Sequence, residues 1–461
     1  MFDLVNESNM SMLTDLYELT MCASYFDNER DEPATFDLFI RRLLPNRSYF
    51  VFAGLDQAVH FLSNVRFDQE QLNYLRKQGF KEDFLDYLRS FKFSGEVWSV
   101  PEGTIVFPNE PLIRVTAPII EAQLVETFLL NTVILQTMIA TKASRVVNAA
   151  QGRPVIEFGL RRTHGTDAGM KAARSSYIAG CVGTSNTLAG MKYGIPIFGT
   201  MAHSFVMFFE EEIEAFRAFS KTFPKTSTLL IDTYDDIEGA RKAAIIAREL
   251  EDKGFRLNGV RLDSGDLAEL SKKVRELLDE KGLNYVRILA SGDLDEYRIE
   301  ELLSKGARID AFGVGTKMST SEDSPHIDVV YKLCEKTDKT GRFLPTMKLS
   351  KDKITLPGRK QVFRIKDNSG NLVKDIIALD GEEVEGEPLL VKVMEKGETV
   401  CELPTLETIR NRALENFSKL PEEYKALRAM PIYPVELSPE LRKMTDELTG
   451  ELKKSEAQNP K

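Results

Sequence analysis

The chain has 461 residues, of which 42% are hydrophobic and 29% charged, so it can form two or three domains with sizeable cores. Its formal net charge of −10 and isoelectric point near 5.3 argue against a protein that coats nucleic acid or an anionic membrane. Its four cysteines have no CxxC or Cys/His spacing, so we expect neither a zinc site nor disulfides, and a reducing, cytoplasmic location. The N-terminus is acidic where a signal peptide would be basic, and no long uncharged apolar run occurs, so we predict no membrane span.

The first 135 residues mix strand and helix patterns and are predicted to form an α/β domain. Strand-like sequence occupies residues 35–44, a helical pattern follows at 75–91, and residues 97–118 predict strands separated by proline and glycine. Residues 119–150 are apolar on nearly every helical face. This pattern predicts a buried helix that leads into the next domain.

Six short apolar runs between residues 154 and 316 each end in glycine and polar or charged residues. They occupy residues 154–162, 195–204, 229–236, 260–266, 288–293 and 311–316. Continuous apolar runs are typical of parallel strands covered by helices on both faces, and helical patterns fill the intervals between these runs. Residues 136–335 are therefore predicted to form a parallel α/β barrel or a doubly wound sheet.

The residues at the ends of these runs should meet at one side of the sheet, where parallel α/β folds place their chemistry. They are Arg161, His203, Asp232, Asp235, Arg261, Asp263, Asp266 and Asp293. Arginines bind phosphate or carboxylate through two parallel hydrogen bonds, so this set suits an anionic substrate. The aspartates have a competing interpretation, because aspartate also caps helices.

Two further motifs have both a functional and a structural interpretation. A helix that begins at Gly315 and Thr316 would offer backbone N–H groups to a phosphate, although a Gly-x-Gly sequence is equally typical of a tight turn. His203 could act as an acid, a base or a nucleophile, with Asp232 or Asp235 orienting its ring, or it could be structural. The motifs taken singly leave these alternatives open.

After residue 335 the alternation of strand and helix patterns stops. Residues 336–400 contain short strand patterns with glycine turn signals such as Asp380-Gly381, and we expect this segment to rejoin the N-terminal strands. Residues 401–461 have a charged, helical pattern. The predicted segments are thus 1–135, 136–335, 336–400 and 401–461.

Nine motifs within residues 14–364, taken together, resemble the nicotinate phosphoribosyltransferase family. In chain order they are TDLYELTM, EFGLRR, GTSNTLAG, FGTMAHS, DTYD, RLDSGD, SGDLDE, FGVGT and PGRKQVFR. The resemblance implies an irregular, incomplete (β/α) barrel, an N-terminal α/β domain completed by the later β-rich segment, and a helical C-terminus. It also implies a homodimer with shared active sites that makes nicotinate mononucleotide from nicotinate and phosphoribosyl pyrophosphate. Mg²⁺ would assist, and ATP hydrolysis would be coupled through a phosphorylated histidine.

The same resemblance implies roles for individual residues. The catalytic residues would be His203, which would carry the phosphate, Asp232 and Asp263. The nicotinate contacts would be Tyr17 from the partner subunit, Phe158 on the other face of the ring, Arg261 at the carboxylate, and Ser185. The phosphoribosyl and phosphate contacts would be Arg161, Gly292, Asp293, Gly315, Thr316, Arg359, Lys360 and one of Arg41 and Arg42. An aromatic ring on each face suits a flat heterocycle.

Ser185 bears on the choice between an acid and an amide substrate. Related nicotinamide phosphoribosyltransferases would carry an acid at this place in GTSNTLAG, and that acid would accept a hydrogen bond from the amide. The hydroxyl of Ser185 can instead donate to a carboxylate, so the sequence favours nicotinate. The alternatives are a nicotinamide phosphoribosyltransferase, another phosphate-binding barrel enzyme such as an aldolase or isomerase, and a nucleotide-binding protein without turnover.

Overall fold

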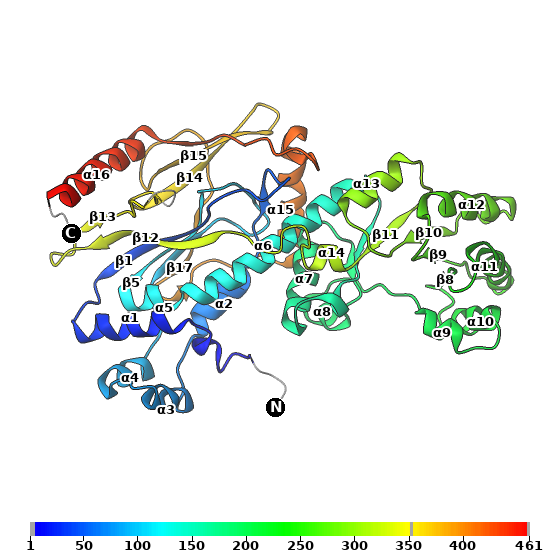
Figure 1. Ribbon diagram of the computed structural model, residues 1–461, viewed down its shortest axis with the longest axis horizontal. Coiled ribbons are helices and arrows are strands. Elements are labelled where there is room, and N and C mark those ends of the chain that lie inside the picture. The colour runs from blue at the N-terminus through cyan, green and yellow to red at the C-terminus, as the bar shows by residue number, and fades with distance from the viewer. Residues whose placement is uncertain (1–4, 351–353, 459–461) are drawn as a thin grey trace. The chain divides into compact units, whose positions relative to one another are not determined.

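The computed structural model of the protein describes residues 5–350 and 354–458 (Figure 1). The chain packs as two compact units. The terminal unit contains Met1–Thr137 and His326–Lys461, and the inserted unit contains Met138–Pro325. The two units are described in turn.

The terminal unit is built on a seven-stranded sheet whose strands come from both ends of the chain (Figure 1). In sheet order the strands are β13 (Phe343–Pro345), β12 (Val329–Thr337), β1 (Pro33–Ile40), β5 (Pro111–Pro118), β3 (Glu96–Ser99), β17 (Val391–Glu395) and β18 (Glu398–Thr399). The nearly continuous apolar sequence of β1 suits its central place, where it pairs antiparallel with both β12 and β5. The expectation that later strands complete the N-terminal β region is confirmed.

Two smaller sheets accompany it in the terminal unit. One has the order β16 (Glu387–Pro388), β14 (Lys360–Lys366), β15 (Leu372–Leu379) and β19 (Val435–Leu437), and the other pairs β2 (Phe50–Val51) with β4 (Ile105–Val106). The β14–β15 hairpin turns at Gly370, whose φ of +79° suits glycine. Asp367 accepts the backbone N–H groups of Ser369 and Asn371 and so closes this turn.

Helices surround these sheets, and the helical C-terminus is confirmed. The helical elements are η1 (Met10–Met12), α1 (Leu16–Asp27), α2 (Leu55–Asn64), α3 (Gln69–Lys77), α4 (Glu82–Arg89), α5 (Ile119–Leu124), α6 (Glu126–Ala149), α15 (Leu406–Lys419), η3 (Glu422–Lys425) and α16 (Pro439–Gln458). Helix α6 belongs to the terminal unit only up to Thr137, and from Met138 it belongs to the inserted unit. Helix α3 starts with a capping box, in which Asp68 and Gln71 satisfy each other's backbone N–H groups.

The apolar segment predicted as one helix forms two, α5 and α6, with Val125 between them. Within the described residues, Ile119–Ala149 is the one segment long and apolar enough to cross a membrane, with a mean hydropathy of 1.4. In its most apolar window 72% is buried inside the protein. A buried core helix can be as long and as apolar as a membrane-spanning helix, and the burial of this segment identifies α6 as a core helix.

The inserted unit contains a parallel six-stranded sheet with connecting helices. In sheet order its strands are β7 (Gly183–Thr184), β6 (Val155–Glu157), β11 (Ala311–Val314), β10 (Arg287–Ala290), β9 (Gly259–Leu262) and β8 (Thr228–Leu230). The connecting elements are η2 (Leu160–Arg162), α7 (Thr166–Ile178), α8 (Thr187–Tyr193), α9 (His203–Met207), α10 (Glu212–Thr222), α11 (Asp236–Glu251), α12 (Leu267–Glu280), α13 (Glu296–Ser304) and α14 (Thr316–Ser319). Strands β7 and β8 are the two edges of this sheet among the described residues, so the sheet is open, which is consistent with the expected incomplete barrel.

One of the six predicted strands is not a strand. The run at residues 195–204 makes only an isolated bridge, between Ile197 and Thr184, and the short strand β7 was not predicted. Pro196 has no N–H to donate, which limits a ladder at this point. A Cβ on Gly183 would lie 2.3 Å from the carbonyl oxygen of Pro196, so only glycine permits the close approach of the two segments.

Candidate active site

Strands β9 and β10 bring Arg261, Asp263 and Ser291 together at their carboxyl ends. Arg261 Nη2 lies 2.6 Å from Asp263 Oδ1, Arg261 Nε donates to Ser291 Oγ at 2.7 Å, and Ser291 Oγ donates to Asp263 Oδ1 at 2.5 Å. Burial alone would raise the pKa of Asp263, but the hydrogen bond from Ser291 and the charge of Arg261 hold it below its usual value. Asp263 is therefore a carboxylate near neutral pH.

An aromatic ring lies beside the same guanidinium. The centre of the Phe158 ring, at the end of β6, is 5.7 Å from the Arg261 guanidinium carbon. A Cβ on Gly313 would lie 2.5 Å from this ring, so the glycine in strand β11 makes room for it. The predicted pair of a carboxylate-binding arginine and a stacking ring is thus brought together.

His203 is the first residue of α9, and its Nδ1 lies 3.1 Å from Thr233 Oγ1. We expected Asp232 or Asp235 to orient this ring, but the structure gives that position to Thr233. Asp232 Oδ2 instead accepts the N–H of Asp263 at 2.9 Å and the hydroxyl of Ser264 at 2.8 Å. The charge that His203 carries when its ring is protonated would contribute to lowering the pKa of Asp263, so the two side chains lie within electrostatic range of each other.

Helix capping accounts for two aspartates that we also considered for the site. Asp235 accepts the N–H groups of Ile237 and Glu238 at the start of α11. Asp266 likewise accepts N–H groups at the start of α12, and Asp295, outside the predicted set, caps α13. Their carboxylates are already engaged, so the structural interpretation applies to both of the predicted residues.

The turn after β10 passes unusually close to the turn after β9. Gly292 has a φ of +89°, and a Cβ there would lie 1.9 Å from the carbonyl oxygen of Asp263. Asp293, with a φ of +50°, points its side chain to solvent, where Lys317 Nζ approaches it and Asp295 at 3.4 Å. Gly292 is therefore required by the backbone itself, whereas Asp293 remains accessible to a ligand.

Gly315 directly precedes helix α14 and Thr316 is its first residue, as the phosphate interpretation required, but α14 has only four residues. Gly315 also lies against the β6 segment, since its Cβ would be 3.1 Å from the carbonyl oxygen of Phe158. The start of α14 and the loop after β6 are therefore neighbours. The exposed Arg161 lies in η2 of that loop and forms no ion pair among the described residues.

A buried carboxylate, Glu157, connects these loops and was not singled out by sequence reasoning. It accepts hydrogen bonds from Thr184 Oγ1 at 2.6 Å, from Ser319 Oγ at 2.9 Å and from the N–H of Gly159. Burial raises its pKa above the usual value. Ser185 joins the group because its N–H donates to the carbonyl oxygen of Glu157 at 2.9 Å. An acid inside the apolar run VIEF was the available signal.

The remaining predicted residues belong to the terminal unit. Tyr17 on α1 is 47% exposed, so its ring is accessible. Arg42 pairs with Asp328 at 2.8 Å, and Arg41 donates its N–H to the carbonyl oxygen of the same residue. Arg359 pairs with Glu335 at 3.0 Å and lies over the ring of Phe343.

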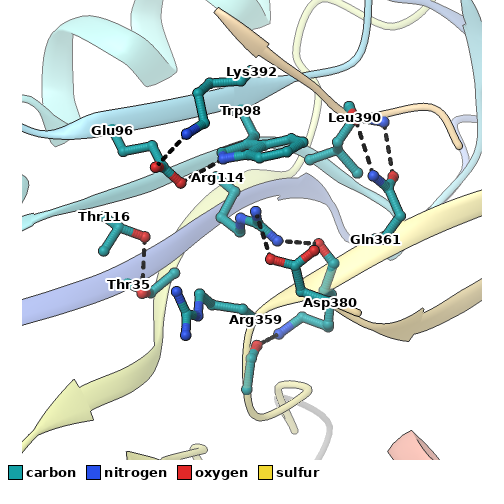
Figure 2. Close-up of polar contacts among 12 residues, drawn as sticks. Thr35, Glu96, Trp98, Arg114, Thr116, Arg359, Gln361, Asp380, Leu390 and Lys392 are labelled. Carbon is teal, nitrogen blue, oxygen red and sulfur yellow. Dashed lines mark hydrogen bonds and ion pairs between the residues drawn. The ribbon is translucent and has the colours of Figure 1, made fainter. Parts of the chain in front are cut away.

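Lys360 does not fit a pyrophosphate contact. Its ammonium is buried, pairs with Asp37 at 2.8 Å and donates to the carbonyl oxygens of Leu356 and Gly358. Arg114 holds the same segment, because it donates to the Lys360 carbonyl oxygen at 2.8 Å. Arg114 also pairs with Asp380 at 3.1 Å, as Figure 2 shows. The Lys360 side chain therefore has a structural role, which corrects the expectation.

Comparison with known proteins identifies the family. Three family models match: the nicotinate phosphoribosyltransferase N-terminal domain at residues 12–134, the nicotinate phosphoribosyltransferase family at 154–354 and the C-terminal domain at 382–445. A nicotinate phosphoribosyltransferase of Mycobacterium tuberculosis is 48% identical over 445 residues, which cover 96% of this chain and 93% of that protein. The chain belongs to the nicotinate phosphoribosyltransferase family.

Other nicotinate phosphoribosyltransferases agree over nearly the whole length. That of Bacillus subtilis is 41% identical over 461 aligned positions, covering 94% of each chain. The crystal structure of human nicotinic acid phosphoribosyltransferase matches with a TM-score of 0.85 at 29% identity, over 94% of this chain and 99% of that one. The fold of this chain is thus similar, over nearly its whole length, to that of a solved nicotinate phosphoribosyltransferase.

The family resemblance implies Mg²⁺, and two carboxylates offer a fit. No group of three or more His, Cys, Asp or Glu in the part of the chain that the structure describes has a geometry suited to a metal ion. Asp232 and Asp236, however, each have a buried Oδ1 without a hydrogen-bond partner, and burial and the charge of Asp232 raise the pKa of Asp236. Mg²⁺ commonly binds one or two carboxylates together with substrate phosphates, so this pair suits it.

Proposed function

We propose that the protein forms nicotinate mononucleotide and pyrophosphate from nicotinate and phosphoribosyl pyrophosphate, in the biosynthesis or salvage of NAD. The observation that carries this proposal is the Arg261 guanidinium beside the Phe158 ring, with the ionised Asp263 2.6 Å from Arg261. A guanidinium and a flat ring suit an aromatic carboxylate. The adjacent carboxylate suits a sugar centre that gains positive charge.

The proposed reaction is a displacement at the anomeric carbon of the ribose. The pyridine nitrogen attacks as pyrophosphate leaves, and its lone pair needs no general base. Asp263 stabilises the oxocarbenium-like centre, while Arg261 and Phe158 hold the ring in position. Mg²⁺, held by Asp232 and Asp236 with the substrate, would neutralise charge on the departing pyrophosphate. Arg161, Gly315 and Thr316 would receive the 5′-phosphate, and Gly292 and Asp293 the ribose.

Ser185 supports nicotinate over nicotinamide as the substrate. Its backbone is fixed by the hydrogen bond to the Glu157 carbonyl oxygen, directly before Phe158. A hydroxyl here can donate to the substrate carboxylate, whereas an acid would repel it. We expect Ser185→Asp to raise the KM for nicotinate about tenfold, because it places a like charge near the carboxylate.

We also propose that ATP hydrolysis is coupled to the transfer through phosphorylation of His203. When Nδ1–H donates to Thr233, Nε2 is left with its lone pair for attack on the γ-phosphorus of ATP. Phosphohistidine formation would release ADP, and its later hydrolysis would release phosphate. His203→Ala should abolish the stimulation by ATP and leave a slower, ATP-independent transfer.

A cytoplasmic homodimer with shared active sites is the proposed assembly. Exposed apolar side chains gather on and beside α8, namely Leu188, Met191, Ile197 and Phe198. Ile197 packs against this helix, since a Cβ on Gly190 would lie 2.3 Å from its Cγ2. Such exposed apolar groups mark association surfaces. The exposed Tyr17 would stack on the nicotinate bound by the partner subunit, opposite Phe158. We propose no nucleic-acid or membrane partner.

The deciding experiment is chromatographic measurement of product from nicotinate or nicotinamide, each with phosphoribosyl pyrophosphate and Mg²⁺, with and without ATP. We expect nicotinate mononucleotide, formed faster with ATP. Product from nicotinamide alone would overturn the Ser185 argument. Absence of any product would overturn the proposed activity, and an ATP effect that survives His203→Ala would overturn the role of His203.

A further inference from the structure

A cluster of buried charges in the inserted unit involves none of the residues assigned so far. Lys142 on α6 places its Nζ 2.6 Å from Glu296 Oε2 and 2.8 Å from Asp323 Oδ1. Arg145, nearly one turn later on α6, places its Nε 3.0 Å from Glu296 Oε1. The Lys142, Arg145 and Glu296 side chains are each at most 1% exposed. The ring of Tyr297 lies beside both cations.

The two carboxylates that share Lys142 lie in or next to two different loops. Glu296 is the first residue of α13, and it directly follows the turn that contains Gly292 and Asp293. Asp323 follows the short helix α14, which begins at Thr316. One ammonium group therefore connects the loop proposed for the ribose with the loop proposed for the 5′-phosphate.

Stability alone does not account for this arrangement. Burying a lysine and a glutamate is costly, and well-packed apolar side chains of similar volume would often be at least as stable. Ion pairs instead constrain position, because one buried ammonium that lies close to two carboxylates limits where both of them can be. A displacement of about 1 Å in a substrate-holding loop is enough to slow a reaction strongly.

We propose that Lys142 is a positioning residue that sets the spacing between the two loops that bind phosphoribosyl pyrophosphate. The inference rests on the proposed function, and it adds a residue on α6 that touches no substrate. Arg145 contacts the second oxygen of Glu296 and so fixes the position of Glu296. Lys142 then fixes the position of Asp323 relative to Glu296. The surface contact of Lys317 with Asp293 and Asp295 joins the same two loops nearer to the solvent.

The test compares Lys142→Met with Arg364→Met. Arg364 forms an equally buried ion pair with Asp375 in the terminal unit, at 2.6 Å, and contacts no proposed substrate loop. Both variants remove a buried cation and should lower the thermal midpoint. We expect only Lys142→Met to raise the KM for phosphoribosyl pyrophosphate, by about tenfold, while the KM for nicotinate changes by less than about twofold.

Two further variants keep the test decisive. Lys142→Arg keeps the charge and should recover most of the affinity for phosphoribosyl pyrophosphate. Asp323→Asn removes one partner that is itself partly exposed, so this variant should fold even if Lys142→Met does not. We expect it to raise the KM for phosphoribosyl pyrophosphate about threefold.

The results separate this inference from the proposed function. A wild-type protein that makes no nicotinate mononucleotide refutes the proposed function. Calorimetric binding of phosphoribosyl pyrophosphate to wild type and Asp323→Asn still tests the positioning role of Lys142. An unchanged affinity in Asp323→Asn overturns the inference. An equal rise of this KM in Lys142→Met and Arg364→Met overturns it as well, since it would reflect general destabilisation.

Discussion

Two arginine–aspartate pairs, one in each unit, show how similar chemistry serves different ends. In the terminal unit, Arg364 grips both oxygens of Asp375, and neither side chain is more than 1% exposed. In the inserted unit, Arg261 touches only one oxygen of Asp263, and the side chains are 17% and 30% exposed. The first pair is closed to solvent, whereas the second is partly exposed and retains donors and acceptors for a ligand. The solvent exposure of the pair, more than the presence of an arginine–aspartate pair, distinguishes the candidate site.

The largest effect expected from this difference is on catalysis by Arg261→Ala. Removing the guanidinium leaves the nicotinate carboxylate unpaired, so kcat/KM should fall about a thousandfold, or ~4 kcal/mol. Steady-state kinetics with varied nicotinate measure this loss. Arg217→Ala removes an exposed arginine that pairs with Glu249 and serves as the control, with kinetics like those of the wild type. A fall of less than about tenfold in Arg261→Ala would remove the main support for the proposed carboxylate contact.

For the closed pair of Arg364 and Asp375, we expect a substitution to lower stability and to leave the kinetics unchanged. Arg364→Leu leaves the buried Asp375 without its cation, which should lower the free energy of unfolding by about 3 kcal/mol. Denaturant titration measures this change. KM values for both substrates should stay within about twofold of the wild type at temperatures where the variant is folded. Unchanged stability, or altered KM values, would contradict the contrast between the pairs.

A backbone change sharpens the comparison at the open site. Gly292→Ala introduces a Cβ 1.9 Å from the Asp263 carbonyl oxygen at a φ of +89°, so the two turns must separate. We expect a loss of about 2 kcal/mol in stability and a fall of more than about tenfold in kcat. Gly254→Ala also has a positive φ, +78°, but no atom within 4 Å of the added Cβ. It should cost only about 1 kcal/mol and leave kcat unchanged.

The smallest effect concerns Glu18, a buried carboxylate that pairs with no cation in the part of the chain that the structure describes. Burial raises the pKa of Glu18 to about 7, although hydrogen bonds from Thr127 and Thr14 partly offset this rise. The folded state thus binds this proton more tightly than the unfolded state does. Protonation of Glu18 therefore stabilises the fold fully below about pH 4.5, and this stabilisation is lost as the pH rises towards 7. Solvent near the exposed Tyr17 screens part of the penalty, so we expect Glu18→Gln to be more stable than wild type by about 1 kcal/mol at pH 8.

Thermal midpoints measured from pH 4.5 to 8 test this expectation. Glu70→Gln on α3 changes an exposed carboxylate and should keep the wild-type pH profile. A Glu18→Gln profile that falls with pH as steeply as that of the wild type would assign the dependence to another group.

The sequence predicted the parallel strands well where the apolar run was long and the polar residues followed at once. Strands β8, β9, β10 and β11 lie where their runs indicated, and Arg261 and Asp263 meet at the strand ends. The prediction was wrong at residues 195–204, because apolar content does not reveal that Pro196 and Gly183 bring two segments together without a ladder.

The roles of the acids were harder to predict, because capping and catalysis use the same residue types. Asp235 and Asp266 cap helices, while Asp232 accepts a hydrogen bond from the backbone N–H of Asp263. Only the three-dimensional positions of the donors separate these outcomes. Lys142 and Glu296 are more than 150 residues apart in sequence, so no local pattern could have paired them.

The interleaved order of the two units has a consequence for synthesis on the ribosome. Strand β5 can pair with one edge of β1 early, but the other edge waits for β12, about 300 residues after β1. At about 5–20 residues per second, that edge stays open for roughly 15–60 s. The inserted unit is one continuous stretch and can fold during this interval. Nascent chains of this protein should therefore depend on chaperones that shield the β1 edge until residue 337 has emerged.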